Sequence, residues 1–158
     1  MKSFDYSIYS SIFFIETELI YILSFNDIKV LQQLPSTDAY VMFTCRHCKM
    51  TSIETGAFID TPNIVKLDIS WNNINAIELR PDIFRGKYSD SEYETIKLET
   101  LDLSHNDIQG LDKMLFEHTP YIRMLDLSYN PIHDIEEETA HAIGSLHKLE
   151  VRIAHFYH

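Results

Sequence analysis

One spacing of apolar residues recurs along the chain and predicts short strands that alternate with return segments. In each phrase, apolar residues fill slots 1, 4, 6 and 11, and Asn fills slot 9. The clearest phrases begin at Ile64, Leu98 and Ile122. Successive side chains of a strand face opposite sides, so slots 4 and 6 point together and slot 5 points away. Each phrase therefore predicts a strand with one buried face.

The step between phrases sets the number of units. The register moves 24 residues from Leu98 to Ile122. This step predicts units that begin near 40, 64, 98, 122 and 146, so residues 40–158 form the repeat region. The unit at 64 is 34 residues long and carries a surplus loop over 85–97. The last unit is weaker, with Ala154 at slot 9 and these residues in its apolar slots: Leu146, Leu149, Val151 and Phe156.

The second halves of the units repeat as well. An apolar residue follows slot 11 by three positions, and a Phe comes next in three units, with Ala140 in the matching place of the fourth. The apolar residues are Ile53, Ile77, Leu111 and Ile135, and the phenylalanines are Phe58, Phe84 and Phe116. Such return segments are expected to pack against the back of the strands. We therefore predict an α/β fold with a parallel sheet on one face and short helices or turns on the other.

This LxxLxLxxNxL phrase is the signature of the leucine-rich repeat. Residues 34–149 resemble the 24-residue, Phe-containing repeats of extracellular leucine-rich-repeat proteins, especially arthropod cell-surface members such as the Toll, chaoptin and connectin groups. Leu31-Gln-Gln-Leu34-Pro35 resembles the stretch that leads into the first repeat of such proteins. The resemblance implies a curved solenoid with its sheet on the concave face.

The resemblance also implies a function. It points to a non-enzymatic protein-interaction module within an extracellular or cell-surface recognition or adhesion protein. The Cys-rich caps that usually flank such repeats are missing from this sequence, and it has no Asn-Xaa-Ser/Thr sequon. An intracellular scaffold or regulatory subunit is therefore the alternative.

The residues at slot 9 are expected to be structural. An amide donates and accepts at once, so stacked amides can satisfy backbone groups of neighbouring turns. The predicted ladder consists of Cys48, Asn72, Asn106 and Asn130.

Outward-facing slots supply the candidate partner-binding residues. Slot 8 holds a file of ring side chains, and Trp and Tyr are enriched at binding hot spots. The predicted binding residues are His47, Trp71, His105, Tyr129, Lys66 and Arg123. The alternative is that the rings merely cover neighbouring turns. Asp68, Asp102 and Asp126 recur at slot 5 and are expected to belong to the framework.

The two cysteines form a Cys45-Arg-His-Cys48 motif. A structural zinc site needs about four ligands, and no second pair follows. A thioredoxin-type pair lies at a helix start, whereas these cysteines fall on inward slots of a strand and its turn. We expect two small core residues and no metal site. A local disulfide is the alternative.

Charge narrows the class of partner. The net charge is −11, with 13 basic and 24 acidic residues. This argues against nucleic acid and against an anionic membrane surface, because both attract basic side chains. A basic or mixed protein is the compatible partner. No motif for phosphate binding, nucleophilic catalysis or a metalloprotease occurs, so we expect neither enzymatic activity nor a cofactor.

The two ends of the chain depart from the repeat pattern. Residues 1–39 are expected to contain a degenerate signal peptide, a cap or a first repeat, in which Glu18 would take slot 1. Acidic residues interrupt the apolar run there, so no membrane-spanning helix is expected. After 146 nothing covers the last predicted unit. We therefore expect either a fragment of a longer array or self-association through uncapped ends.

Overall fold

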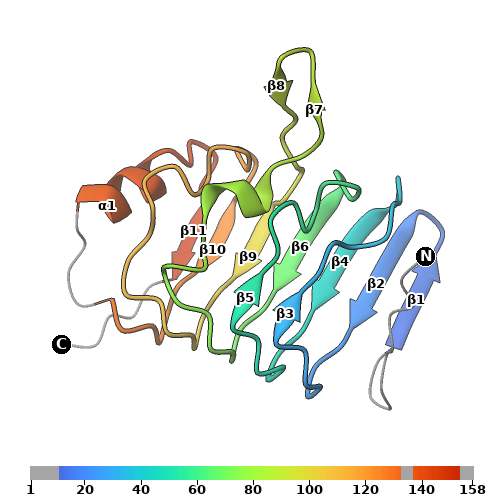
Figure 1. The fold of residues 1–158 in the computed structure, drawn as a ribbon, viewed down its shortest axis with the longest axis horizontal. Coiled ribbons are helices and arrows are strands. Elements are labelled where there is room, and N and C mark those ends of the chain that lie inside the picture. The colour runs from blue at the N-terminus through green and yellow to red at the C-terminus, as the bar shows by residue number, and fades with distance from the viewer. Residues whose placement is uncertain (1–10, 133–136, 154–158) are drawn as a thin grey trace.

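A curved sheet of seven strands forms one face of the protein (Figure 1). The computed structural model describes residues 11–132 and 137–153. The strand order is β1 (Ser11–Ile15), β2 (Glu18–Ile22), β4 (Tyr40–Thr44), β6 (Ile64–Asp68), β9 (Thr100–Asp102), β10 (Met124–Asp126) and β11 (Val151–Ile153). Every neighbouring pair is parallel except β1 and β2, which form an antiparallel hairpin. The predicted leucine-rich-repeat solenoid is confirmed.

Return segments cover the convex side of the sheet with little regular structure. They contain the two-stranded pair β3 (Val30–Leu31) and β5 (Ser52–Ile53), the 3₁₀ turn η1 (Pro81–Phe84) and the helix α1 (Glu137–Gly144). The phenylalanine rings of Phe58 and Phe84 stack behind the strands with centroids 5.9 Å apart. In front of them, Leu67 pairs with Leu101 and Leu101 with Leu125, and all three are buried. Slots 4 and 6 therefore build one continuous core.

Two predicted core positions in the return segments are wrong. Ile77 is 81% exposed, and Leu79, at 1%, is buried instead. Ala140 is exposed on α1, where Ala142 and Ile143 are buried. A helix exposes and buries residues with a period of 3.6, so a spacing taken from extended and turn segments does not carry over to it. Ile135 lies outside the described residues.

The register of the last strand differs from the predicted 24-residue step. Met124 pairs with Val151, a step of 27 residues, so the unit is displaced by three from a start at 146. This return segment contains α1, and a helix advances only about 1.5 Å per residue against about 3.3 Å for an extended chain. More residues are therefore needed to return to the sheet. Leu146, which follows the helix in the chain, is buried, while Ala154 and Phe156 lie outside the described residues.

The surplus loop of the long unit forms a β-hairpin that projects from the body (Figure 1). Its strands are β7 (Tyr88–Ser89) and β8 (Glu92–Tyr93). Gly86 lies at its base, where a Cβ atom would meet Glu94 O at 2.7 Å, so the two arms can approach closely only with glycine there. The guanidinium of Arg85 lies 4.8 Å from the centre of the Tyr93 ring.

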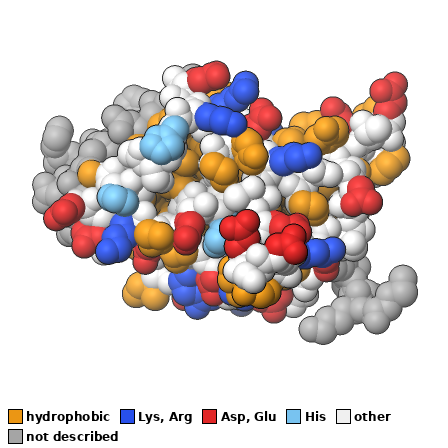
Figure 2. Space-filling view, turned by 90° about the horizontal axis from the view of Figure 1, so that it is seen from above, with side chains coloured by type: hydrophobic (Ala, Val, Ile, Leu, Met, Phe, Trp, Pro, Cys, Tyr) orange, Lys and Arg blue, Asp and Glu red, His pale blue; other side chains and the backbone are white. Residues whose placement is uncertain are grey.

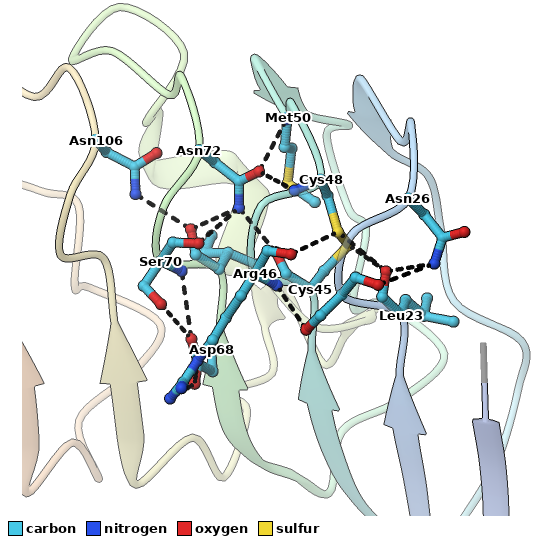
Figure 3. The surroundings of a disulfide bond; sticks show 12 residues. Leu23, Asn26, Cys45, Arg46, Cys48, Met50, Asp68, Ser70, Asn72 and Asn106 are labelled. Carbon is cyan, nitrogen blue, oxygen red and sulfur yellow. Dashed lines mark hydrogen bonds and ion pairs between the residues drawn. A yellow bond between two sulfur atoms is a disulfide. The ribbon is translucent and has the colours of Figure 1, made fainter. Parts of the chain in front are cut away.

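The slot 9 amides link consecutive turns (Figure 3). Asn72 Nδ2 donates to Ile69 O of its own turn and to Cys45 O of the preceding turn, while its Oδ1 accepts from Cys48 N and Met50 N. Asn106 and Asn130 repeat the pattern and accept from Ile74 N and Ile108 N. Each amide therefore satisfies buried backbone groups on two turns.

At Cys48 a covalent bond takes the place of this amide. Cys45 and Cys48 form a disulfide, which corrects the expectation of two unlinked core residues. Slots 6 and 9 both face the interior, so the two sulfur atoms meet inside the turn, and both residues are fully buried. Cys48 Sγ lies 3.2 Å from Leu23 O but carries no proton to donate. That carbonyl accepts from Asn26 Nδ2 at 2.7 Å.

The segment that begins at Glu18 contributes a full turn. Tyr21 pairs with Phe43, and Tyr21, Leu23 and Asn26 are buried in the positions of slots 4, 6 and 9. β1 then covers the outer edge of β2, with all five of its residues exposed. Among the described residues, no helix is long and apolar enough to cross a membrane.

Replacing Asn106 with Ala should destabilise the fold strongly. The variant loses the bonds to Ile69 O, Leu103 O and Ile74 N. Ile69 O and Leu103 O keep the amides of Asn72 and Asn130, whereas the buried Ile74 N is left without a partner, which costs about 1–3 kcal/mol. At about 2–4 °C per kcal/mol, the thermal midpoint should fall by roughly 2–12 °C. Calorimetry measures it. Asn73→Ala is the matched control, because Asn73 is exposed and should change stability by less than about 0.5 kcal/mol. Equal effects of the two would contradict the register.

Candidate partner-binding surface

A file of aromatic rings runs along the edge of the sheet where the parallel strands end. It consists of Phe25, His47, Trp71, His105 and Tyr129, here called the ring file. All five have φ between 52° and 63°, the left-handed conformation. Each therefore turns the chain away from the sheet, just before the slot 9 residue points inward.

The rings contact one another in chain order, and all the pairs are stacked except His47 and Trp71, whose rings are tilted. Neighbouring centroids are 5.0 Å apart from Phe25 to His47, 4.9 Å from His47 to Trp71, 3.6 Å from Trp71 to His105 and 4.1 Å from His105 to Tyr129. A left-handed residue other than glycine costs roughly 1–2 kcal/mol. Each aromatic contact stabilises the folded state by about 0.5–1.5 kcal/mol. Stacking thus offsets part of the strain at these turns, so the rings have a structural role.

The ring file is also accessible. Trp71 is 47% exposed, Tyr129 is 44% exposed and Phe25 is 72% exposed. Phe25 is not among the predicted binding residues, although the sequence carries the signal: it fills slot 8 of the unit that begins at Glu18. That unit is only one of three interpretations of the N-terminal segment, so the repeat pattern alone did not assign its slot 8.

Slots 3 and 5 form two rows across the concave face. The register aligns slot 3 as Ile20, Met42, Lys66, Thr100 and Met124, and slot 5 as Ile22, Thr44, Asp68, Asp102 and Asp126. Both rows are apolar or neutral over β2 and β4. From β6 onward slot 5 is acidic, whereas slot 3 holds a basic, a neutral polar and an apolar side chain. The concave face is therefore apolar at one end and carries the aspartates, together with Lys66, at the other.

The three slot 5 aspartates, here called the aspartate row, are tied to the turns that follow them. Oδ1 of Asp68 accepts from Ser70 N and Oγ, and Asp102 and Asp126 accept in the same way from Ser104 and Ser128. These bonds agree with the expected framework role. Asp68 also accepts from Arg46 Nε at 2.7 Å (Figure 3). This hydrogen bond to Asp68 raises the pKa of the Arg46 guanidinium.

A pocket of about 180 Å³ opens between these side chains on the concave face. It is lined by Arg46, Lys66, the aspartate row, Thr100, Leu101, Met124 and Leu125. Burial raises the pKa of Asp102, and the neighbouring carboxylates of Asp68 and Asp126 add to this, whereas the bonds from Ser104 lower it. The lining holds three carboxylates against the two cations Arg46 and Lys66, so the partly dehydrated pocket carries a small excess of negative charge.

The six predicted binding residues do not meet at one point. His47, Trp71, His105 and Tyr129 stack together, and Lys66 lines the pocket. Arg123 lies just before β10, and its guanidinium is 3.8 Å from the carboxylate of Glu150. The edge of the molecule seen in Figure 2 intersperses acidic, basic and apolar side chains without a dominant sign. Within the described ranges, no three His, Cys, Asp or Glu residues are arranged to hold a metal ion.

Comparison with protein families identifies the repeats. A leucine-rich-repeat model matches residues 96–152, and a second matches residues 62–76. These segments are leucine-rich repeats. They include the strands β6, β9 and β10 with Asn72, Asn106 and Asn130, and repeats of this kind generally mediate protein–protein interaction. No curated protein matches the chain.

Proposed function

We propose that the protein is a non-enzymatic protein-interaction module of an extracellular or cell-surface recognition or adhesion protein. The observation that carries the proposal is the half-exposed ring file beside a concave face with its own pocket. Exposed Trp and Tyr at such a surface are typical anchors of protein interfaces. A net charge of −11 favours a partner with a basic surface.

The disulfide supports the extracellular setting. Disulfides persist in oxidising compartments and are rare in the cytosol. Cys45 and Cys48 are both consumed by the bond, and no free cysteine remains. The resemblance to arthropod cell-surface repeats agrees with this setting. An intracellular scaffold or regulatory subunit is the second candidate, favoured by the absence of a glycosylation sequon.

Replacing Trp71 and Tyr129 with Ala should weaken partner binding about 30-fold, which corresponds to roughly 2 kcal/mol for hot-spot side chains. The purified protein is screened against a panel of extracellular domains. The affinity of each selected partner is then measured for the unchanged protein and for the double variant. Tyr88→Ala is the matched control, because this ring is 64% exposed on the hairpin, outside the ring file. Unchanged affinity in a double variant with a native circular dichroism spectrum would refute the assignment.

The compartment can be tested through the thiols. Protein from its native source is precipitated with acid, redissolved in denaturant near neutral pH, alkylated without reductant and weighed by mass spectrometry. We expect Cys45 and Cys48 to stay unmodified and to react only after reduction. Denaturation removes the protection that burial alone would give. Two alkylated cysteines before reduction would favour the intracellular alternative.

A further inference from the structure

The two oxygens of each carboxylate in the aspartate row have different partners. At Asp68, Oδ1 accepts from Ser70, and Oδ2 is bound by the guanidinium of Arg46. At Asp102 and Asp126, Oδ1 is bound by the following serine in the same way. No hydrogen bond or ion pair within the described ranges reaches Oδ2 of either residue.

The repeat explains why only one of the three oxygens is occupied. Arg46 stands at slot 7 of its unit and reaches the aspartate of the next unit. The following units carry Ser70 and Ser104 at slot 7, and these side chains bind the aspartate of their own unit. The chain thus supplies a guanidinium to the first place in the row and leaves the equivalent oxygen of Asp102 and Asp126 open.

The pocket around these oxygens suits a long cationic side chain. Asp102 and Asp126 are register partners on neighbouring strands, about 4.8 Å apart. Met124, which is half-exposed, adds apolar surface on which the methylene stem of such a side chain can lie. A cation between the carboxylates would also remove the repulsion that contributes to the raised pKa of Asp102.

We propose that this pocket receives an arginine side chain of the protein partner, with its guanidinium bound by Asp102 Oδ2 and Asp126 Oδ2. The inference rests on the proposed function and names the chemistry that the partner presents. Arginine is favoured over lysine, because its planar fork can serve two carboxylates and because Arg46 already binds the equivalent oxygen. A divalent metal ion is disfavoured, since Asp68 is already paired with Arg46.

The probe is an acetylated, amidated pentapeptide of four alanines and a central arginine. Its matched controls replace arginine by lysine or by citrulline, which keeps the shape and removes the charge. Each is titrated into the ¹⁵N-labelled full chain, and the amide signals of Leu101 and Leu125 are followed. We expect saturable shifts with the arginine peptide and binding weaker by about tenfold or more with citrulline.

The double variant Asp102→Asn, Asp126→Asn keeps an oxygen for Ser104 and Ser128 and removes both charges. It should fold and lose at least about tenfold in affinity for the arginine peptide. Asp90→Asn, in the exposed turn of the hairpin, should bind normally. Equal binding of arginine and citrulline, or no loss in the double variant, would overturn the proposal. Equal binding of lysine would overturn the choice of arginine, and tighter binding of calcium chloride at the same signals would replace it with a metal site.

The same titration of Trp71→Ala, Tyr129→Ala separates this proposal from the proposed function. The pocket should bind the arginine peptide normally in that variant. If the arginine peptide does not bind the unchanged chain, but the ring variant no longer binds the protein partner, the pocket assignment fails and the interaction surface stands. If the peptide binds but no protein partner depends on the rings, the pocket assignment stands and the proposed interaction surface fails.

Discussion

The slot 9 amide is the contact on which the rest of the structure depends. Asn72, Asn106 and Asn130 each donate to a carbonyl of the preceding turn and accept from an amide of that turn. These bonds lie at the point where the chain leaves the sheet, so strand pairing alone cannot supply them. They fix the stacking of each turn on the next at about the strand spacing of 4.8 Å.

Both candidate surfaces follow from this fixed spacing. The ring file immediately precedes the amides, so rings from separate units come within stacking distance. The aspartate row lies four residues before the amides and repeats with the same register. A surface of this kind varies only in the side chains placed on it, because the backbone repeats. Arg46 illustrates the point: one departure from serine at slot 7 occupies one of three equivalent carboxylates.

The sequence predicted the parts that depend on periodicity. The strands at Tyr40, Ile64, Leu98 and Ile122, the buried slots and the adjacency of His47, Trp71, His105 and Tyr129 all follow from one register. The prediction from the sequence failed where the register changes. The helix α1 lengthened one unit to 27 residues, and the hairpin β7–β8 occupied a loop whose length could be counted but whose conformation could not. The disulfide could have been predicted from the sequence, because slots 6 and 9 of one turn both face inward. The open Oδ2 atoms of Asp102 and Asp126 could not have been predicted from the sequence, because only the three-dimensional structure shows which carboxylate oxygen the serine binds.

Amide hydrogen exchange tests most directly whether the slot 9 amides hold the turns together. The backbone amides of Met50, Ile74 and Ile108 lie outside the main sheet, yet each donates to the Oδ1 of the next unit's Asn. If these bonds hold the turns, the three amides exchange only through global unfolding, as slowly as the central strands. Glu94, whose amide is bonded to Lys87 O within the exposed hairpin, serves as the reference. Exchange of the three amides as fast as that of Glu94 would contradict this role of the slot 9 amides.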